Sequence, residues 1–69
     1  MINNSVIHTA GIETEEQAQH VSAILKAMIG VKSANVNIVD GSVEVEYETP
    51  SNLDSIEKEI YDAGYKVIY

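Results

Sequence analysis

Two kinds of hydrophobic spacing alternate along the 69-residue chain, and their order constrains the fold more than any other feature. Apolar residues recur at intervals of three and four in residues 18–28 and 53–63, which is the spacing of amphipathic helices. Apolar and polar residues alternate, as they do in β-strands, in residues 5–10, 34–39, 42–48 and 65–69. The predicted order is therefore strand, helix, strand, strand, helix, strand.

The side chains that should face the core follow from these spacings. In the first strand Ile7 and Thr9 share one face, whereas Val6 and His8 share the other. The first helix should present a stripe formed by Ala18, Val21, Ile24, Leu25 and Met28. The second helix should present Leu53, Ile56, Ile60 and Ala63. The hairpin segments should place on their inner face Ala34, Val36, Ile38, Val43, Val45 and Tyr47.

Turn and cap residues separate the predicted elements. We expect Gly30 to end the first helix and Gly64 to close the second, just past its last helical residue. The Asp-Gly pair at residues 40–41 tolerates positive φ, which predicts a two-residue hairpin turn. Ser51 or Asn52 is expected to cap the start of the second helix.

This order and these lengths predict an α+β fold, a single domain over residues 1–69 with a ferredoxin-like βαββαβ arrangement. Its four-stranded antiparallel sheet would carry both helices on one face and leave the other face open. Strand alternation then makes the open face polar and acidic, since it would carry Val6, His8, Asn35, Asn37, Glu44 and Glu46.

Charge excludes several classes of partner and reaction. The chain carries eleven acidic residues against four basic ones, all lysines, for a formal charge of −7. This balance repels nucleic acid and anionic lipid, and the lack of arginine weighs against phosphate-binding sites. No serine, histidine and acid set has the context of a catalytic triad, and the glycines form no phosphate-binding loop. We therefore expect that the protein is not an enzyme.

The chain also lacks the features of exported or membrane-spanning proteins. It has no cysteine, so that neither a disulfide nor a thiolate site can form. Its first residues contain no basic region followed by an apolar run, and no apolar stretch is long enough to span a bilayer. We expect a cytoplasmic protein.

Several short motifs match one known family in order and spacing. A Gly-Ile pair at residues 11–12 opens a loop before the first helix, and Gly-Val follows that helix at residues 30–31. Further matches lie at residues 36–38, 41–45 and 63–67. Together these segments resemble the heavy-metal-associated domain of small copper chaperones and metal-pumping ATPases, with Ile12 at the position of an inward-facing methionine.

The resemblance fails at the two positions that define the chemistry of the family. The family loop has the pattern Gly-Met-x-Cys-x-x-Cys, and its two cysteines hold the metal, whereas this chain has Thr14 and Gln17 at those positions. Monovalent copper prefers sulfur donors, and a hydroxyl and an amide are hard and neutral. We therefore expect the copper site of the family to be absent and no cofactor to be bound.

Residues 14–17 instead have the pattern of a helix start. The Thr14 hydroxyl can accept a hydrogen bond from an N–H of the first turn, while the Gln17 side chain reaches back to the backbone of Thr14. Such a cap is worth about 1 kcal/mol. Acidic residues at positions 13, 15 and 16 add a favourable interaction with the positive end of the helix.

The resemblance also implies an interaction surface. Family members dock by the loop end onto a like-folded domain of a pump with complementary charge. On that basis Glu13, Glu15, Glu16 and Tyr65 would contact a basic protein partner such as a metal-transporter domain. The chain would then be a degenerate member of the family, kept as a protein-interaction or regulatory module linked to metal homeostasis.

Three alternatives remain open from the sequence. Glu16 and His20, one helical turn apart, could hold zinc or nickel weakly, although a solvated acidic face explains them more simply. His8 could make a pH-sensitive contact with Glu44 or Glu46 on the adjoining strand, or be a surface histidine. The chain also resembles ACT domains, which share the strand order, and could be a small-molecule-sensing homodimer with its ligand at the loop after the first strand.

Overall fold

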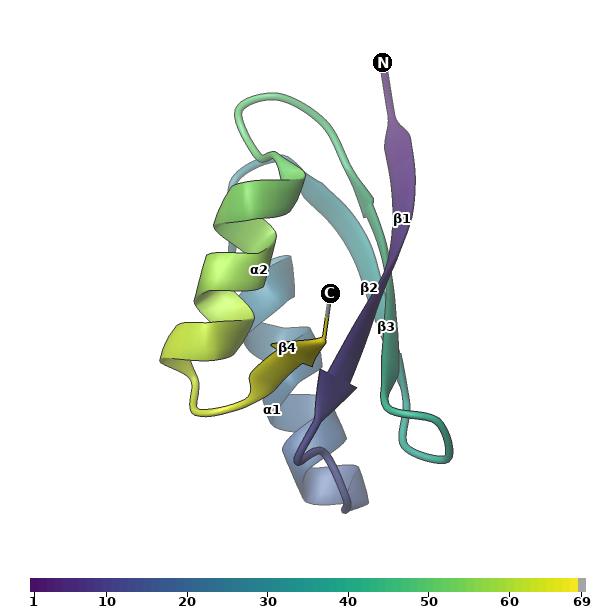
Figure 1. Ribbon diagram of the computed structural model, residues 1–69. Helices are drawn as coiled ribbons and strands as arrows, with labels where there is room; N and C mark the ends of the chain where they lie inside the picture. Colours follow the sequence, from purple (N-terminus) through teal and green to yellow (C-terminus); the bar gives the residue numbers. More distant parts are fainter. Residues whose placement is uncertain (69) are drawn as a thin grey trace.

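The computed structural model describes residues 1–68 and confirms the predicted order of elements (Figure 1). These elements are β1 (Asn3–Ala10), α1 (Glu15–Lys26), β2 (Val31–Asn37), β3 (Ser42–Tyr47), α2 (Leu53–Asp62) and β4 (Lys66–Ile68). The strands form one antiparallel sheet in the order β2-β3-β1-β4, and both helices lie on the same face of it. The prediction that the last strand reaches Tyr69 falls outside the described residues.

A single hydrophobic core lies between the sheet and the helices. Ile7 and Thr9 point into it from β1, as the alternation predicts, and both are almost fully buried. Burying an aliphatic side chain such as that of Ile7 contributes about 1.5–3 kcal/mol, and the core of a 69-residue chain has room for few such side chains. The buried apolar residues are Ile7, Ile12, Ala18, Val21, Leu25, Ala34, Val43, Val45, Tyr47, Ile56, Ile60 and Val67.

Helix α2 begins and ends at residues that the sequence identifies. Its N-cap is Asn52, whose side-chain oxygen accepts a hydrogen bond from the Ser55 N–H at 2.9 Å. Ser51, the other candidate, is buried and donates its hydroxyl to the Ile29 carbonyl at 2.6 Å. At the C-terminus Gly64 has a φ of +99°, and the N–H of Tyr65 reaches back to the Ile60 carbonyl at 3.3 Å. This is the Schellman arrangement, which satisfies carbonyls that the helix leaves free.

Helix α1 ends earlier than predicted. Its last helical residue is Lys26 and its C-cap is Ala27, so Gly30 lies in the following loop and does not end the helix. Gly30 has a φ of +99°, and its carbonyl accepts a hydrogen bond from the Glu48 N–H at 2.8 Å. A Cβ at this position would lie 2.3 Å from the Glu48 carbonyl oxygen. The glycine is therefore required by the close approach of two loops.

The hairpin between β2 and β3 also differs from the prediction. The last paired residues are Asn37 and Ser42, so the connection is a loop over residues 38–41, and the predicted two-residue turn is wrong. Side chains shape this loop, because the Asn37 amide oxygen accepts from the Val39 N–H at 2.9 Å and the Asp40 carboxylate accepts from the Ser42 N–H at 3.0 Å. Ile38 lies in the loop and is exposed instead of facing the core.

In residues 1–68, neither helix is long and apolar enough to cross a membrane.

Candidate functional site

Contacts with the hydrophobic core hold the loop between β1 and α1 in place. Gly11 has a φ of +101°, and a Cβ there would lie 3.7 Å from ring carbon Cδ1 of Tyr65. Ile12 is 4% exposed and belongs to the core, as its place in the family pattern predicts. The tyrosine, half-buried against the core, thus lies beside the first residue of the loop. These contacts fix where the chain turns into α1.

The predicted capping box is present at the start of α1. The Thr14 hydroxyl accepts a hydrogen bond from the Gln17 N–H at 3.1 Å, and the Gln17 side-chain oxygen accepts from the Thr14 N–H at 3.1 Å. The same Gln17 oxygen also accepts from the Glu13 N–H at 2.8 Å. One side chain therefore closes the loop across two backbone donors.

The oxygen atoms at positions 14 and 17 are already engaged within the loop. If either oxygen bound a metal ion, it would lose the hydrogen bonds that hold the turn. Both oxygens are also hard, neutral donors. Within residues 1–68 no three His, Asp or Glu side chains come together in an arrangement that could hold a metal ion. Glu16 and His20 are both exposed, and among the described residues no third such side chain joins them.

The acidic residues of the loop lie at the positive end of α1 and face solvent. Glu13, Glu15 and Glu16 are all exposed, and the ion pairs found in residues 1–68 involve none of them. Carboxylates in the first turn interact favourably with the helix dipole and stabilise the start of the helix, and they remain charged and exposed to solvent. The loop end of the domain therefore presents negative charge that forms no ion pair within residues 1–68, in a loop whose first residue, Gly11, lies beside the half-buried ring of Tyr65.

The structure places His8 differently from the sequence-based expectation. Its strand partners are Ser42 and Ile68, whereas Glu44 lies opposite Val6. The carboxylate whose pKa is affected by the charge of His8 is Asp40, which the sequence identified only as a turn residue. Hydrogen bonds from the side chain and backbone of Ser42 lower the pKa of Asp40 from its ordinary value of 3.8, with a smaller contribution from the charge of His8.

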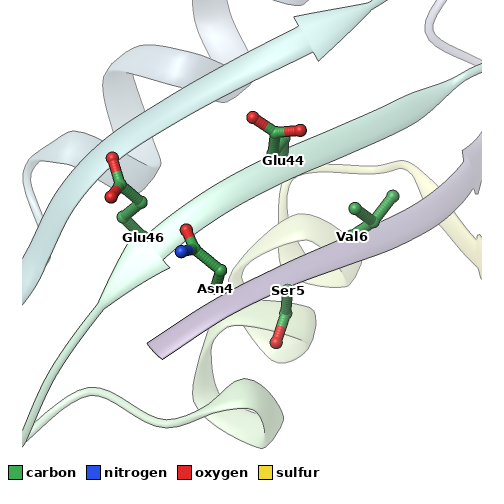
Figure 2. Close-up of a pocket in the computed structure, with 5 residues that line it drawn as sticks. All are labelled: Asn4, Ser5, Val6, Glu44 and Glu46. Carbon is green, nitrogen blue, oxygen red and sulfur yellow. The ribbon is translucent and has the colours of Figure 1, made fainter. Parts of the chain in front are cut away.

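The open face of the sheet carries a hollow that the sequence could not show. It has a volume of about 470 Å³ and is lined by Asn4, Ser5, Val6, Glu44 and Glu46. Figure 2 shows the side chains of Asn4, Val6, Glu44 and Glu46 on the same side of the sheet and that of Ser5 on the opposite side. The polar, acidic character predicted for this face is confirmed, since Glu44 is exposed and Glu46 is partly exposed.

Comparison with known proteins decides the family. The sequence pattern of the heavy-metal-associated domain matches residues 7–66, which is most of the chain. The chain belongs to the heavy-metal-associated family.

Solved structures agree with this assignment. A structure titled "CsoZ metallochaperone" is 58% identical, with a TM-score of 0.96 over 100% of both chains. A "CopZ metallochaperone" is 27% identical, with a TM-score of 0.92 over 96% of this chain and 100% of that one. The N-terminal domain of a potential copper-translocating P-type ATPase from Bacillus subtilis, 24% identical, shares the fold with a TM-score of 0.89 over 97% of this chain and 85% of that one. A comparison with curated proteins gives no match.

Proposed function

We propose that this heavy-metal-associated domain has lost the copper site of its family and acts as a protein-interaction or regulatory module in metal homeostasis, without enzymatic activity. The observation that carries the proposal is the capping box. Thr14 and Gln17 stand at the two positions where the family pattern has cysteines, and each accepts a hydrogen bond from the backbone N–H of the other. The loop is held by its own side chains and needs no ion for its shape.

The proposed loss of copper binding rests on donor chemistry. In the family pattern two thiolates supply soft donors and compensate the charge of monovalent copper, whereas a hydroxyl and an amide do neither. The chain contains no cysteine anywhere, so no thiolate elsewhere can take over. Met28 is packed against the core and Met1 is a lone exposed thioether at the chain end, which leaves no pair of sulfur donors.

The proposed interaction uses the loop end of the domain. Glu13, Glu15 and Glu16 are exposed and form no ion pair within residues 1–68, and Tyr65 lies next to the first residue of the loop. A basic surface would be attracted to this end, because complementary charge steers association and fixes orientation. Two similar solved structures are metallochaperones and a third is a domain of a potential copper-translocating ATPase, so we propose a like-folded domain of a metal transporter as the partner.

The copper part of the proposal is tested by competition. The protein is titrated with copper(I) against a chelator of known affinity under anaerobic conditions. We expect the chelator to keep the metal at all protein concentrations used. Sub-micromolar binding of copper(I) by the unchanged chain would overturn this part of the proposal.

The interaction part is tested by charge reversal. The isolated heavy-metal-associated domain of a copper-transporting ATPase from the same organism serves as the probe, and affinity is measured by calorimetry or by NMR titration. The variant Glu15→Lys/Glu16→Lys should bind at least about tenfold more weakly than the unchanged protein. The matched control, Glu57→Lys/Glu59→Lys, makes the same charge change on α2 and should have a much smaller effect. Equal effects of the two variants would contradict docking by the loop end.

A further inference from the structure

The loop between β2 and β3 contains a pair of residues whose backbone can rearrange without an enzyme. Asp40 precedes Gly41, and no other aspartate or asparagine of the chain precedes a glycine. In an Asp-Gly pair the glycine nitrogen can attack the side-chain carboxyl group of the aspartate, because glycine has no side chain to hinder the attack and its backbone adopts conformations that other residues rarely reach. Asp40 is exposed, so its carboxyl group exchanges protons freely with water.

The rearrangement has two steps, and only water enters or leaves. The nitrogen of Gly41 first forms a bond to Cγ of the protonated Asp40 side chain. The hydroxyl group of that side chain and the proton of the nitrogen leave together as water, and a five-membered imide remains. Water then adds to either carbonyl of the imide. Attack at the main-chain carbonyl yields isoaspartate, in which the chain runs through Cβ and Cγ. The product has the mass of the original protein and an additional methylene in its main chain.

The folded loop holds the attacking glycine by hydrogen bonds. The N–H of Gly41 donates to the Asn37 carbonyl at 2.9 Å, and this bond would be lost if the nitrogen gave up its proton. The Gly41 carbonyl accepts from the Thr9 N–H at 2.9 Å and from the Thr9 hydroxyl at 2.7 Å. A Cβ at Gly41 would lie 2.5 Å from the Thr9 carbonyl oxygen, so the glycine packs directly against the backbone of β1. It is therefore fixed at both its nitrogen and its carbonyl.

The loop also holds the carboxyl group that would be attacked. Oδ1 of Asp40 accepts hydrogen bonds from the Ser42 hydroxyl at 2.6 Å and from the Ser42 N–H at 3.0 Å. These bonds orient the carboxylate toward residue 42 and lower the pKa of Asp40, because they favour its charged form. The rearrangement needs the protonated form, whose hydroxyl group can leave as water. At a given pH, Ser42 therefore makes the reactive form of Asp40 rarer.

We propose that Asp40 is a latent modification site, which forms isoaspartate when the hairpin loop opens and which Ser42, as a positioning residue, keeps unreactive in the folded protein. Loops are among the parts of a fold that open most easily, so the bonds just described control the rate. The change would loosen β1, because the additional methylene displaces the Gly41 carbonyl that accepts both hydrogen bonds of Thr9. The proposal does not depend on docking by the loop end.

Comparison of the folded protein with a peptide tests the protective role of the loop. The whole protein and a synthetic peptide of residues 36–46 are incubated side by side at mildly acidic pH. Isoaspartate at position 40 is then measured by mass spectrometry with fragmentation that distinguishes the two linkages. We expect the protein to react at least about tenfold more slowly than the peptide, because several hydrogen bonds must break before the loop can react. Equal rates in the protein and the peptide would overturn the proposal.

Three variants test the role of Ser42. Ser42→Ala should speed the rearrangement at least about threefold, whereas Ser33→Ala, which removes the hydroxyl bonded to Glu46, should change the rate less than about twofold. Thr9→Val frees the glycine but keeps the bonds to the carboxylate, so it should also speed the reaction. Only in Ser42→Ala should the pH dependence of the rate move to higher pH, since only there does the pKa of Asp40 return toward 3.8. Equal rates in the two serine variants, or the same pH dependence in Ser42→Ala as in the unchanged protein, would overturn the role of Ser42.

Discussion

Thr14 and Gln17 hold each other in place at the start of α1 through reciprocal hydrogen bonds of 3.1 Å between side chain and backbone. We predict that Thr14→Ala and Gln17→Ala each lower the free energy of unfolding by about 1 kcal/mol. In the double variant the loss should be smaller than the sum of the two single losses, because each substitution removes part of the same box. Urea denaturation measures all three. Strict additivity would show that the two side chains act independently.

The same pair predicts what would restore the chemistry of the family. In Thr14→Cys/Gln17→Cys two thiolates replace the capping oxygens, and we expect copper(I) binding with sub-micromolar affinity in the chelator competition. The metal-free variant should be less stable than the unchanged protein by about 1 kcal/mol, because the cap is lost. Thr14→Ser/Gln17→Ser is the matched control without sulfur and should gain no copper binding. Failure of the cysteine variant to bind would mean that the loop geometry, and not the donors, excludes the metal.

The features that the sequence predicted well depend on interactions close along the chain. The capping box joins residues three apart, and the glycine cap of α2 at position 64 acts within a single turn, so both could be recognised from spacing. The strand faces followed from simple alternation, as the burial of Val43 and Val45 shows. For the candidate site, the acidic loop could be recognised directly in the sequence, whereas the inward side chain at position 12 was expected only from the resemblance to the heavy-metal-associated family.

The features that the sequence did not show depend on contacts between distant segments or on competing turn chemistry. Gly30 was assigned to the end of α1, but its positive φ serves the contact with Glu48, 18 positions later along the chain, through a hydrogen bond of 2.8 Å. The hairpin loop is longer than an Asp-Gly pair requires because Asn37 and Asp40 bond to the backbone two residues on. The hollow on the open face arises from the register of β1 with β3, which spacing alone does not define.

Gly30 and Gly64 allow the cost of that distant contact to be measured. Both glycines have a φ of +99°, but a Cβ at Gly30 would lie 2.3 Å from the Glu48 carbonyl oxygen, whereas one at Gly64 would meet nothing within 4 Å. Gly64→Ala should therefore lower the free energy of unfolding by only about 1–2 kcal/mol, which is the cost of holding alanine in the left-handed backbone conformation. Gly30→Ala should cost at least about 1 kcal/mol more, since backbone atoms must shift. Thermal or urea unfolding compares them, and equal losses would show that the loop moves aside freely.

The hydrogen bonds in the hairpin loop predict that protonation of Asp40 at low pH lowers the stability of the protein. Its carboxylate accepts hydrogen bonds from the Ser42 hydroxyl at 2.6 Å and from the Ser42 N–H at 3.0 Å, and these lower its pKa below 3.8. A depressed pKa means that the charged form is favoured by folding, so the contribution to stability is complete above 3.8 and is lost as the pH falls through the folded value.

Removal of the hydroxyl tests this assignment directly. In Ser42→Ala the largest cause of the shift is lost, and the pKa of Asp40 should move back toward 3.8 when its carboxyl carbon is followed by NMR titration. His8→Ala removes only a smaller electrostatic contribution and should move the pKa less. Because Asp40 is fully exposed, added salt should reduce the His8 effect while leaving the Ser42 effect largely unchanged. A larger change in His8→Ala than in Ser42→Ala would show that charge, and not hydrogen bonding, controls this loop.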